Sequence, residues 1–168
     1  MAGLTPPCAL TVDDDRDQFD CGRDSLNQWF RRHAWRNQQS GVTRTSVMCD
    51  TVSGAIVGHV SLSTAQIQRE FLPKAAQRNQ PDPLPVILLG QLAVDRVHQG
   101  NGIARSLMRY ALTTASRLSV HIRCFGVLTH PTDDGARKFY SAFGFENLVG
   151  DPQHSMLVRM ADLERDGS

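Results

Sequence analysis

The stretch LLGQLAVDRVHQGNGIA, residues 88–104, decides how this chain folds. It begins within an apolar run that starts at Val86, which is typical of a buried strand. It ends in a turn with two glycines, Gly100 and Gly102, and leads into residues 103–112, whose apolar side chains fall at helical spacing. A strand that passes through glycines into a helix can hold a phosphate group, because several backbone N–H groups point the same way and the helix N-terminus carries partial positive charge.

Two common nucleotide-binding motifs do not fit this turn. A dinucleotide-binding fingerprint needs a third glycine where this chain has Arg105, and residues 119–126 offer no acidic residue for a ribose. The Gly-Lys-Ser/Thr of a nucleoside triphosphate loop is also missing after the turn. The pattern that remains is Gln99-x-x-Gly102-x-Ala104.

Length and composition predict an ordinary globular protein. The chain has 168 residues, a formal net charge of +1 and 40% hydrophobic residues, so we expect one domain over 1–168 with a polar, frayed tail from about 162. The cysteines are scattered without a C-x-x-C pair, so we expect no metal site. No secretory signal is visible and no apolar run reaches the ~18 residues of a membrane span, so we expect a cytoplasmic protein without membrane contact.

The order of elements indicates an α/β fold, with a single mixed central sheet of about six to seven strands and helices on both faces. Residues 64–85 are expected to form a long polar connection with a short helix over 69–78. Strands are expected near 9–12, 43–49, 55–63, 86–94, 123–129, 145–148 and 155–160, and longer helices from about 24, over 103–118 and over 134–143.

The first long helix should begin with Asp24 or Ser25 as its N-cap. Its apolar face is predicted at helical spacing, and four arginines lie off or beyond that face. Between residues 23 and 44, five arginines oppose one aspartate, which fits either a solvated helix surface or a contact for the phosphates of a nucleic acid. The predicted apolar face is Leu26, Trp29, Phe30, His33 and Ala34, and the candidate contact residues are Arg31, Arg32, Arg36 and Arg44.

Two motifs in the second half of the chain carry a family resemblance. Gln99-x-x-Gly102-x-Ala104 is followed by Ala136-x-x-Phe139-Tyr140-x-x-x-Gly144-Phe145, and this pair, in this order, resembles the GNAT family of N-acetyltransferases. Further segments resemble one GNAT subgroup, the toxins of type II toxin–antitoxin pairs. They are Phe19-x-Cys21-Gly22, Leu26-Asn27-x-Trp29-Phe30, His33-Ala34, Arg44-Thr45, residues 58–63, Leu84-Pro85, residues 89–95 and Asp151-Pro152.

The resemblance implies a GNAT fold and an acetyl-CoA-dependent enzyme without a metal. Members of the subgroup acetylate the α-amino group of aminoacyl-tRNA and so block translation. The resemblance also implies a homodimer that is neutralised by a ribbon-helix-helix antitoxin and that meets operator DNA only through that antitoxin. Acetyl-CoA is then expected along Leu92, Ala93, Val94, Gln99, Gly100, Asn101, Gly102, Ile103, Ala104 and Arg105.

Tyr140 stands on the family position of the general acid that protonates the leaving thiolate. A phenol with a pKa of about 10 stays protonated at neutral pH and can donate that proton. The alternative is an aromatic ring that only packs, although Phe139, Ala142 and Phe143 already form an apolar face of this helix without it.

A strong general base is not obligatory, because an α-amino group is less basic than a lysine side chain. His59, His98 and His130 are the candidates for a general base, and each can also be interpreted as a structural histidine.

The chain departs from the subgroup at Gln91, where an arginine is usual, and at His59, where an aromatic residue is usual. These departures bear on the choice of acceptor, so two other functions stay open: a GNAT enzyme that acetylates a protein N-terminus or a small amine, and a non-catalytic module that binds acyl-CoA or an antitoxin.

Overall fold

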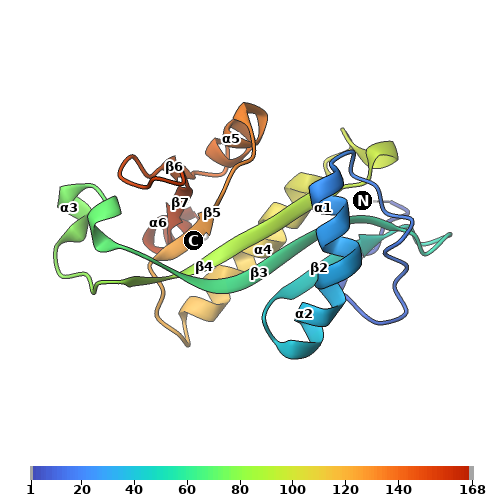
Figure 1. Ribbon diagram of the computed structural model, residues 1–168, viewed down its shortest axis with the longest axis horizontal. Helices are drawn as coiled ribbons and strands as arrows, with labels where there is room; N and C mark the ends of the chain where they lie inside the picture. Colours follow the sequence, from blue (N-terminus) through green and yellow to red (C-terminus); the bar gives the residue numbers. More distant parts are fainter. Residues whose placement is uncertain (1, 167–168) are drawn as a thin grey trace. The chain divides into compact units, whose positions relative to one another are not determined.

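The structure is a computed structural model that describes residues 2–166. Seven strands form a sheet in the order β1-β2-β3-β4-β5-β7-β6, in which β4 pairs with β5 in parallel while the β1–β2, β2–β3, β5–β7 and β6–β7 ladders are antiparallel. The predicted mixed sheet is therefore confirmed. The elements (Figure 1) are β1 (Cys8–Ala9), α1 (Asp24–Trp29), η1 (Phe30–Ala34), α2 (Trp35–Ser40), β2 (Arg44–Cys49), β3 (Ile56–Ile67), η2 (Arg69–Phe71), α3 (Lys74–Gln77), β4 (Leu84–Val94), η3 (Arg96–His98), α4 (Ile103–Ser119), β5 (Gly126–Thr129), α5 (Asp134–Ser141), β6 (Glu146–Asn147), β7 (Met156–Arg159) and α6 (Met160–Asp166).

The chain divides into two compact units, each built from two separate stretches of sequence. The first unit contains the residues up to Ser63 together with Gly90–Ala111, and the second contains Thr64–Leu89 together with the residues from Leu112 onward. The two units are described separately below. The expectation of one catalytic domain stays a prediction.

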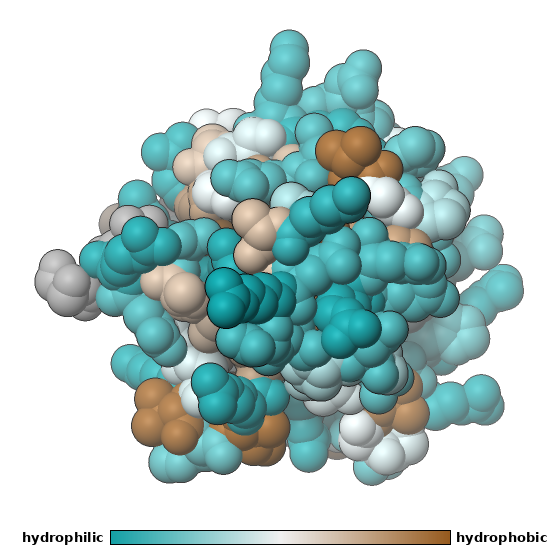
Figure 2. Space-filling model, turned by 90° about the vertical axis from the view of Figure 1, so that its left-hand side faces the viewer, coloured by the Kyte–Doolittle hydropathy of each residue, from teal (hydrophilic) through white to brown (hydrophobic). Residues whose placement is uncertain are grey.

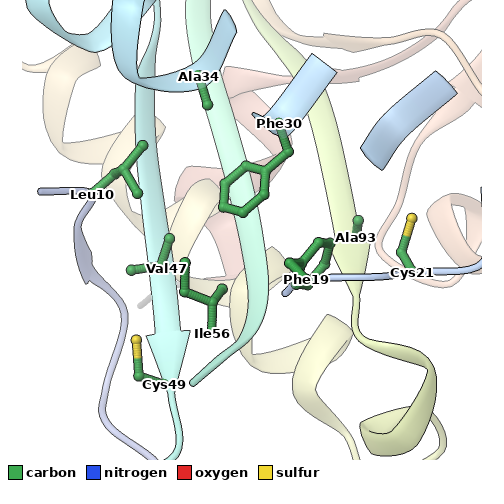
Figure 3. Packing of buried hydrophobic residues seen from close by; sticks show 9 residues of the cluster. All are labelled: Leu10, Phe19, Cys21, Phe30, Ala34, Val47, Cys49, Ile56 and Ala93. Carbon is green, nitrogen blue, oxygen red and sulfur yellow. The ribbon is translucent and has the colours of Figure 1, made fainter. Parts of the chain in front are cut away.

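In the first unit, helices cover both faces of the β2–β3 hairpin. α1, η1 and α2 lie over one face (Figure 1), where Phe30 of η1 packs in a core cluster with Val47 and Ile56 of the strands (Figure 3). The first turns of α4 cover the other face, because a Cβ on Gly58 would stand 2.9 Å from Leu107 Cδ1. Glycine at this position lets α4 approach the strand closely, and it places the start of α4 firmly on the sheet.

The first helical segment differs from the prediction at its start and in its middle. α1 begins at Asp24 with Arg23 in the N-cap position and no side-chain capping bond, so neither predicted cap is used. η1 is a turn of π-helix, whose i→i+5 bonds shift the side chains around the axis. As a result Ala34 is buried while His33, which was predicted on the apolar face, is exposed.

The first strand is shorter than predicted. β1 ends at Ala9, because the Thr11 N–H donates to the carboxylate of Asp14 at 2.7 Å and starts a turn there. β3 is longer than predicted and runs into the connection over 64–85, where Ile67 packs into a second core cluster with Leu84 and Leu128. Only short helices, η2 and α3, remain of the helix predicted over 69–78.

In the second unit, β4 pairs with β5 over Ile87↔Val127 to Leu89↔Thr129, and β5 pairs with β7 along its whole length. β5 begins at Gly126 rather than at 123. A Cβ on Gly126 would stand 2.2 Å from the carbonyl oxygen of Val158, so these two strands are in backbone contact. The frayed tail predicted from about 162 is wrong for the described residues, because Met160–Asp166 form the helix α6.

Large apolar side chains at the surface are few. The face drawn in Figure 2 is mainly hydrophilic, and its hydrophobic residues form small separate groups. No helix among residues 2–166 combines the length and the apolar character that a membrane crossing needs. The exposed large hydrophobic residues are Val12, Val42, Val52, Val97, Leu118, Val120, Ile122 and Val149.

Candidate active site

The turn between β4 and α4 has the geometry that the sequence predicts for an anion site. Gly100 and Gly102 adopt left-handed φ values of +83° and +81°, which glycine reaches without strain. The first hydrogen bond of α4 runs from the Ser106 N–H to the Gly102 carbonyl at 3.1 Å. The N–H groups of residues 103–105 therefore precede the first full helical bond and carry the positive end of the helix dipole. They are suited to bind a phosphate.

The side chain of Gln99 fastens this turn to the rest of the first unit. Its Nε2 donates to the carbonyl of Val94, at the end of β4, at 3.0 Å, and to the carbonyl of Cys21 at 3.1 Å. Sequence alone predicted Gln99 only as a coenzyme contact. The side chain makes bonds within the protein, which leaves the backbone of Gln99 as the part that a ligand could use.

Three polar residues for which the sequence predicted no role at the site, Asp20, Asn27 and Asp95, hold the same junction. The Asp95 carboxylate accepts hydrogen bonds from the N–H groups of Val97 at 3.1 Å and Asp20 at 3.2 Å. Asn27, which is only 4% exposed, accepts from the Cys21 N–H at 2.9 Å and donates to Asp20 Oδ1 at 2.8 Å. An asparagine within an amphipathic helix is the sequence signal that could have revealed this network, because a buried amide needs hydrogen-bond partners.

β4 extends past its ladder with β5 before it reaches the turn. The last β4–β5 pair is Leu89↔Thr129, and the strand continues to Val94. Ala93 is buried, whereas Leu92 and Val94 are half-buried. This segment is part of the chain along which the resemblance implies that acetyl-CoA binds.

Tyr140 lies in the second unit, on α5. The helix starts at the N-cap Asp133, whose carboxylate accepts from the Ala136 N–H at 2.8 Å. Tyr140 is 8% exposed, whereas Ala142 is exposed, so the apolar face predicted without Tyr140 is wrong: the tyrosine ring itself faces the core. Phe145 packs at 5.5 Å from the tyrosine ring.

The hydroxyl of Tyr140 has a defined partner despite the burial of the ring. It is hydrogen-bonded to the side chain of Thr129 at the end of β5. Burial raises the pKa of Tyr140, and the bond to Thr129 offsets only part of this effect. Thr129 Oγ1 also lies 3.2 Å from the Leu89 carbonyl, to which it donates, and this contact holds the threonine side chain in place. The phenol is therefore protonated and oriented at neutral pH.

The three candidate histidines have different surroundings. His59 is fully buried, and neither ring nitrogen has a hydrogen-bond partner within the described part of the chain. His98 lies with Nδ1 at 3.6 Å from the Asp95 carboxylate. His130 directly follows β5, is exposed, and has its Nδ1 at 2.7 Å from the hydroxyl of Ser155. Of the three, His130 alone combines exposure with a neutral hydrogen-bond partner that orients its ring.

The four candidate arginines are all exposed, but two are held by backbone carbonyls. Arg31 Nη2 donates to the Phe19 carbonyl at 2.7 Å, and Arg44 Nη1 donates to the Gln38 carbonyl at 3.4 Å. Arg32 lies on η1 and Arg36 lies four residues later, on the consecutive helix α2. Their role in RNA contact stays a prediction. Residues 2–166 contain no group of three potential metal ligands from histidine, cysteine, aspartate and glutamate.

Comparison with known proteins places this geometry in a family. A model of the acetyltransferase (GNAT) family matches residues 10–145. A protein of Mycobacterium tuberculosis named tRNA-acetylating toxin is 37% identical over 158 residues, which cover 94% of each chain. The structure of AtaT complexed with acetyl-methionyl-tRNAfMet has a TM-score of 0.90 and 28% identity, covering 98% of this chain and 99% of that one. A mutant of the toxin AtaT, bound to the C-terminus of the antitoxin AtaR and to acetyl-CoA, has a TM-score of 0.82 and 25% identity, covering 99% of both chains.

Proposed function

This chain belongs to the acetyltransferase (GNAT) family, and we propose that it is a toxin that transfers an acetyl group from acetyl-CoA to the α-amino group of an aminoacyl-tRNA. The observation that carries the proposal is the identity with a tRNA-acetylating toxin over nearly the whole of both chains. The likeness to AtaT in complex with an acetylated aminoacyl-tRNA supports the same class of acceptor. Blocked α-amino groups cannot form peptide bonds, so translation would stop.

A labelling experiment tests this proposal directly. The purified protein is incubated with radiolabelled acetyl-CoA and, in separate reactions, total aminoacyl-tRNA, deacylated tRNA, total protein or polyamines. We expect label in a product that ribonuclease destroys, only when the tRNA is charged. Label in protein or polyamine would instead identify the enzyme as a GNAT with another acceptor, and no transfer to any acceptor would favour a non-catalytic binding module.

We infer that the coenzyme diphosphate is held by the backbone of residues 99–105 and that the pantetheine arm pairs with the backbone of residues 92–94. The left-handed glycines, and the N–H groups of residues 103–105 that precede the bond from the Ser106 N–H to the Gly102 carbonyl, support the first assignment. An extended arm that adds to the exposed part of a strand is a common mode of recognition, which supports the second. A backbone N–H near residues 92–94 would then stabilise the oxyanion, a contribution worth about 3–4 kcal/mol in other enzymes.

We propose that Tyr140 is the general acid of the reaction. Attack of the amine on the thioester breaks the carbon–sulfur bond, and the thiolate takes the phenolic proton. Replacing Tyr140 by Phe is expected to lower kcat by about 10²–10⁴ while acetyl-CoA still binds. The matched control is Tyr110→Phe, which removes the other tyrosine hydroxyl of the chain, one that accepts a bond from Ser46 at 3.0 Å. Normal turnover by the Tyr140→Phe variant would exclude this role.

We propose that Arg31, Arg32, Arg36 and Arg44 contact the tRNA backbone. Arg32→Ala combined with Arg36→Ala is the sharper test, because Arg31 also supports the fold through the Phe19 carbonyl. Each lost phosphate contact is expected to reduce the slope of log affinity against log salt by about 0.7–0.9. Arg78→Ala, an exposed arginine on the other unit, is the control. An unchanged salt slope in the double variant would place the RNA surface elsewhere.

We further propose the assembly that the subgroup implies: a homodimer, neutralised by a ribbon-helix-helix antitoxin that also carries the complex to operator DNA. A cytoplasmic location follows from a tRNA substrate. The complex of AtaT with the C-terminus of its antitoxin supports the existence of such a partner. Light scattering of the purified protein tests the dimer. A ribbon-helix-helix protein encoded in the adjacent reading frame, co-purifying with this chain, tests the antitoxin.

A further inference from the structure

Three side chains of the second unit form a hydrogen-bonded chain that the proposed mechanism does not yet use. Asp151 is 6% exposed and accepts bonds from the N–H groups of Gln153 at 2.9 Å and Ser155 at 3.2 Å, and from the Ser155 hydroxyl. Ser155 is fully buried, and its Oγ lies 2.7 Å from His130 Nδ1. A buried carboxylate is thus connected through a buried hydroxyl to an exposed imidazole.

The direction of these bonds fixes the tautomer of His130. Burial alone would raise the pKa of Asp151, but the bonds from Ser155 and Gln153 outweigh it and lower the pKa, so the group is a carboxylate that can only accept. The Ser155 hydroxyl has one hydrogen and gives it to Asp151. His130 Nδ1 must therefore carry a hydrogen and donate it to Ser155. Nε2 is left with the lone pair, which makes it the basic nitrogen of the ring.

His130 is also the immediate neighbour of the residue that holds the proposed acid. Thr129, which binds the Tyr140 hydroxyl, ends β5, and His130 follows it. Both groups belong to the same unit of the structure. The oriented imidazole and the residue that binds the hydroxyl of the proposed acid are therefore adjacent at the end of β5.

We propose that His130 is a catalytic residue of the acetyl transfer and that its Nε2 takes the proton that the attacking amine must lose. This inference rests on the proposed function. As the amine nitrogen bonds to the acetyl carbon, the carbon–sulfur bond breaks. The nitrogen proton goes to His130 Nε2, and the thiolate takes the proton of Tyr140. The imidazolium then returns a proton to the phenolate through water, so both residues end neutral and the products are the N-acetyl amide and free coenzyme A. Ser155 and Asp151 are positioning residues, because they act through the imidazole.

Two substitutions of His130 test the role with the full-length protein, acetyl-CoA and total aminoacyl-tRNA. His130→Ala removes the whole ring. His130→Asn keeps an N–H donor in the place of Nδ1, which preserves the bond to Ser155 but supplies no base. Both are expected to lower kcat by about 10²–10⁴ and to leave KM for acetyl-CoA unchanged. His121→Asn, an exposed histidine of the same unit, is the matched control and is expected to behave as wild type.

Chemical rescue separates catalysis from a structural effect. Imidazole in the buffer is expected to restore activity of His130→Ala by about tenfold or more, and to have no effect on Tyr140→Phe. Ser155→Ala is expected to lose about 10–100-fold, as orienting partners of functional histidines do elsewhere. His130 variants with wild-type turnover, or a loss that imidazole does not restore, would overturn the inference and leave the proposed function standing. If wild type does not acetylate aminoacyl-tRNA at all, the proposed function itself fails.

Discussion

His59 gives the folded protein a stability that depends on pH. The ring is fully buried, lies 4.0 Å from the ring of Phe30 in a parallel stack and 5.1 Å from that of Phe19, and has no hydrogen-bond partner within the described residues at either nitrogen. Burial lowers its pKa from 6.5 to about 3. The folded protein therefore keeps this imidazole neutral under conditions in which the unfolded chain protonates it.

The size of the effect follows from this difference in pKa. Below pH 6.5 the unfolded chain binds a proton at His59 that the folded chain does not, so the free energy of unfolding falls as the pH falls, until about pH 3. The slope is about 1.4 kcal/mol for each pH unit, which gives a loss of about 2 kcal/mol between pH 7 and pH 5. This is a large share of the 5–15 kcal/mol typical of a domain.

Urea denaturation of wild type and His59→Phe at pH 7 and pH 5 measures this contribution. The larger Phe ring is expected to cost about 1–3 kcal/mol of overpacking at both pH values, so the difference between the two pH values carries the information. Between pH 7 and pH 5, the free energy of unfolding of wild type is expected to fall by about 2 kcal/mol more than that of the variant. His121→Asn, which removes an exposed histidine, is expected to keep the wild-type dependence. Equal losses in wild type and His59→Phe would refute the reasoning.

Three further substitutions have expected outcomes. Gly126→Ala is expected to lower the free energy of unfolding, measured with urea, by about 3 kcal/mol or more, because the added Cβ would clash with the Val158 carbonyl oxygen. Gly135→Ala in α5 is the control and is expected to cause no such loss. Asp133→Ala removes the N-cap of α5 and is expected to cost about 1 kcal/mol, seen as a lower thermal midpoint. Gln99→Ala removes two bonds to backbone carbonyls, so we expect a loss of about 1–2 kcal/mol and a higher KM for acetyl-CoA with kcat unchanged. An unaltered KM would mean that the turn does not need this support.

The elements with strong periodicity were predictable from the sequence. The predictions of a strand over 86–94 and a helix over 103–118 agree closely with β4 and α4, because both segments have continuous apolar faces and the glycine turn marks the boundary between them. The helix predicted over 134–143 also starts where α5 starts, at Asp134, directly after its N-cap Asp133. The family resemblance identified the fold and the enzyme class, since its motifs lie in these well-determined elements.

The features of the fold and of the candidate site that the sequence did not predict depend on tertiary contacts or on local irregularities of the helices. Gln99 and Cys21 are 78 residues apart, and nothing local announces their hydrogen bond. The π-helical turn that exposes His33 also has no signature in the apolar spacing. Tyr140 was expected off the apolar face, but the ring is buried because Phe145, after the helix, packs against it. The coenzyme contacts and the role of Tyr140 stay predictions.

The bonds from Gln99, Asp95 and Asn27 have a consequence for the thermodynamics of ligand binding. A segment that is already ordered has little conformational entropy left to lose when a ligand arrives. More of the interaction energy is then retained as affinity, which is the advantage of preorganisation. Hydrogen exchange at the amides of residues 95–98 will therefore be slow in the free protein, and acetyl-CoA will slow it little further.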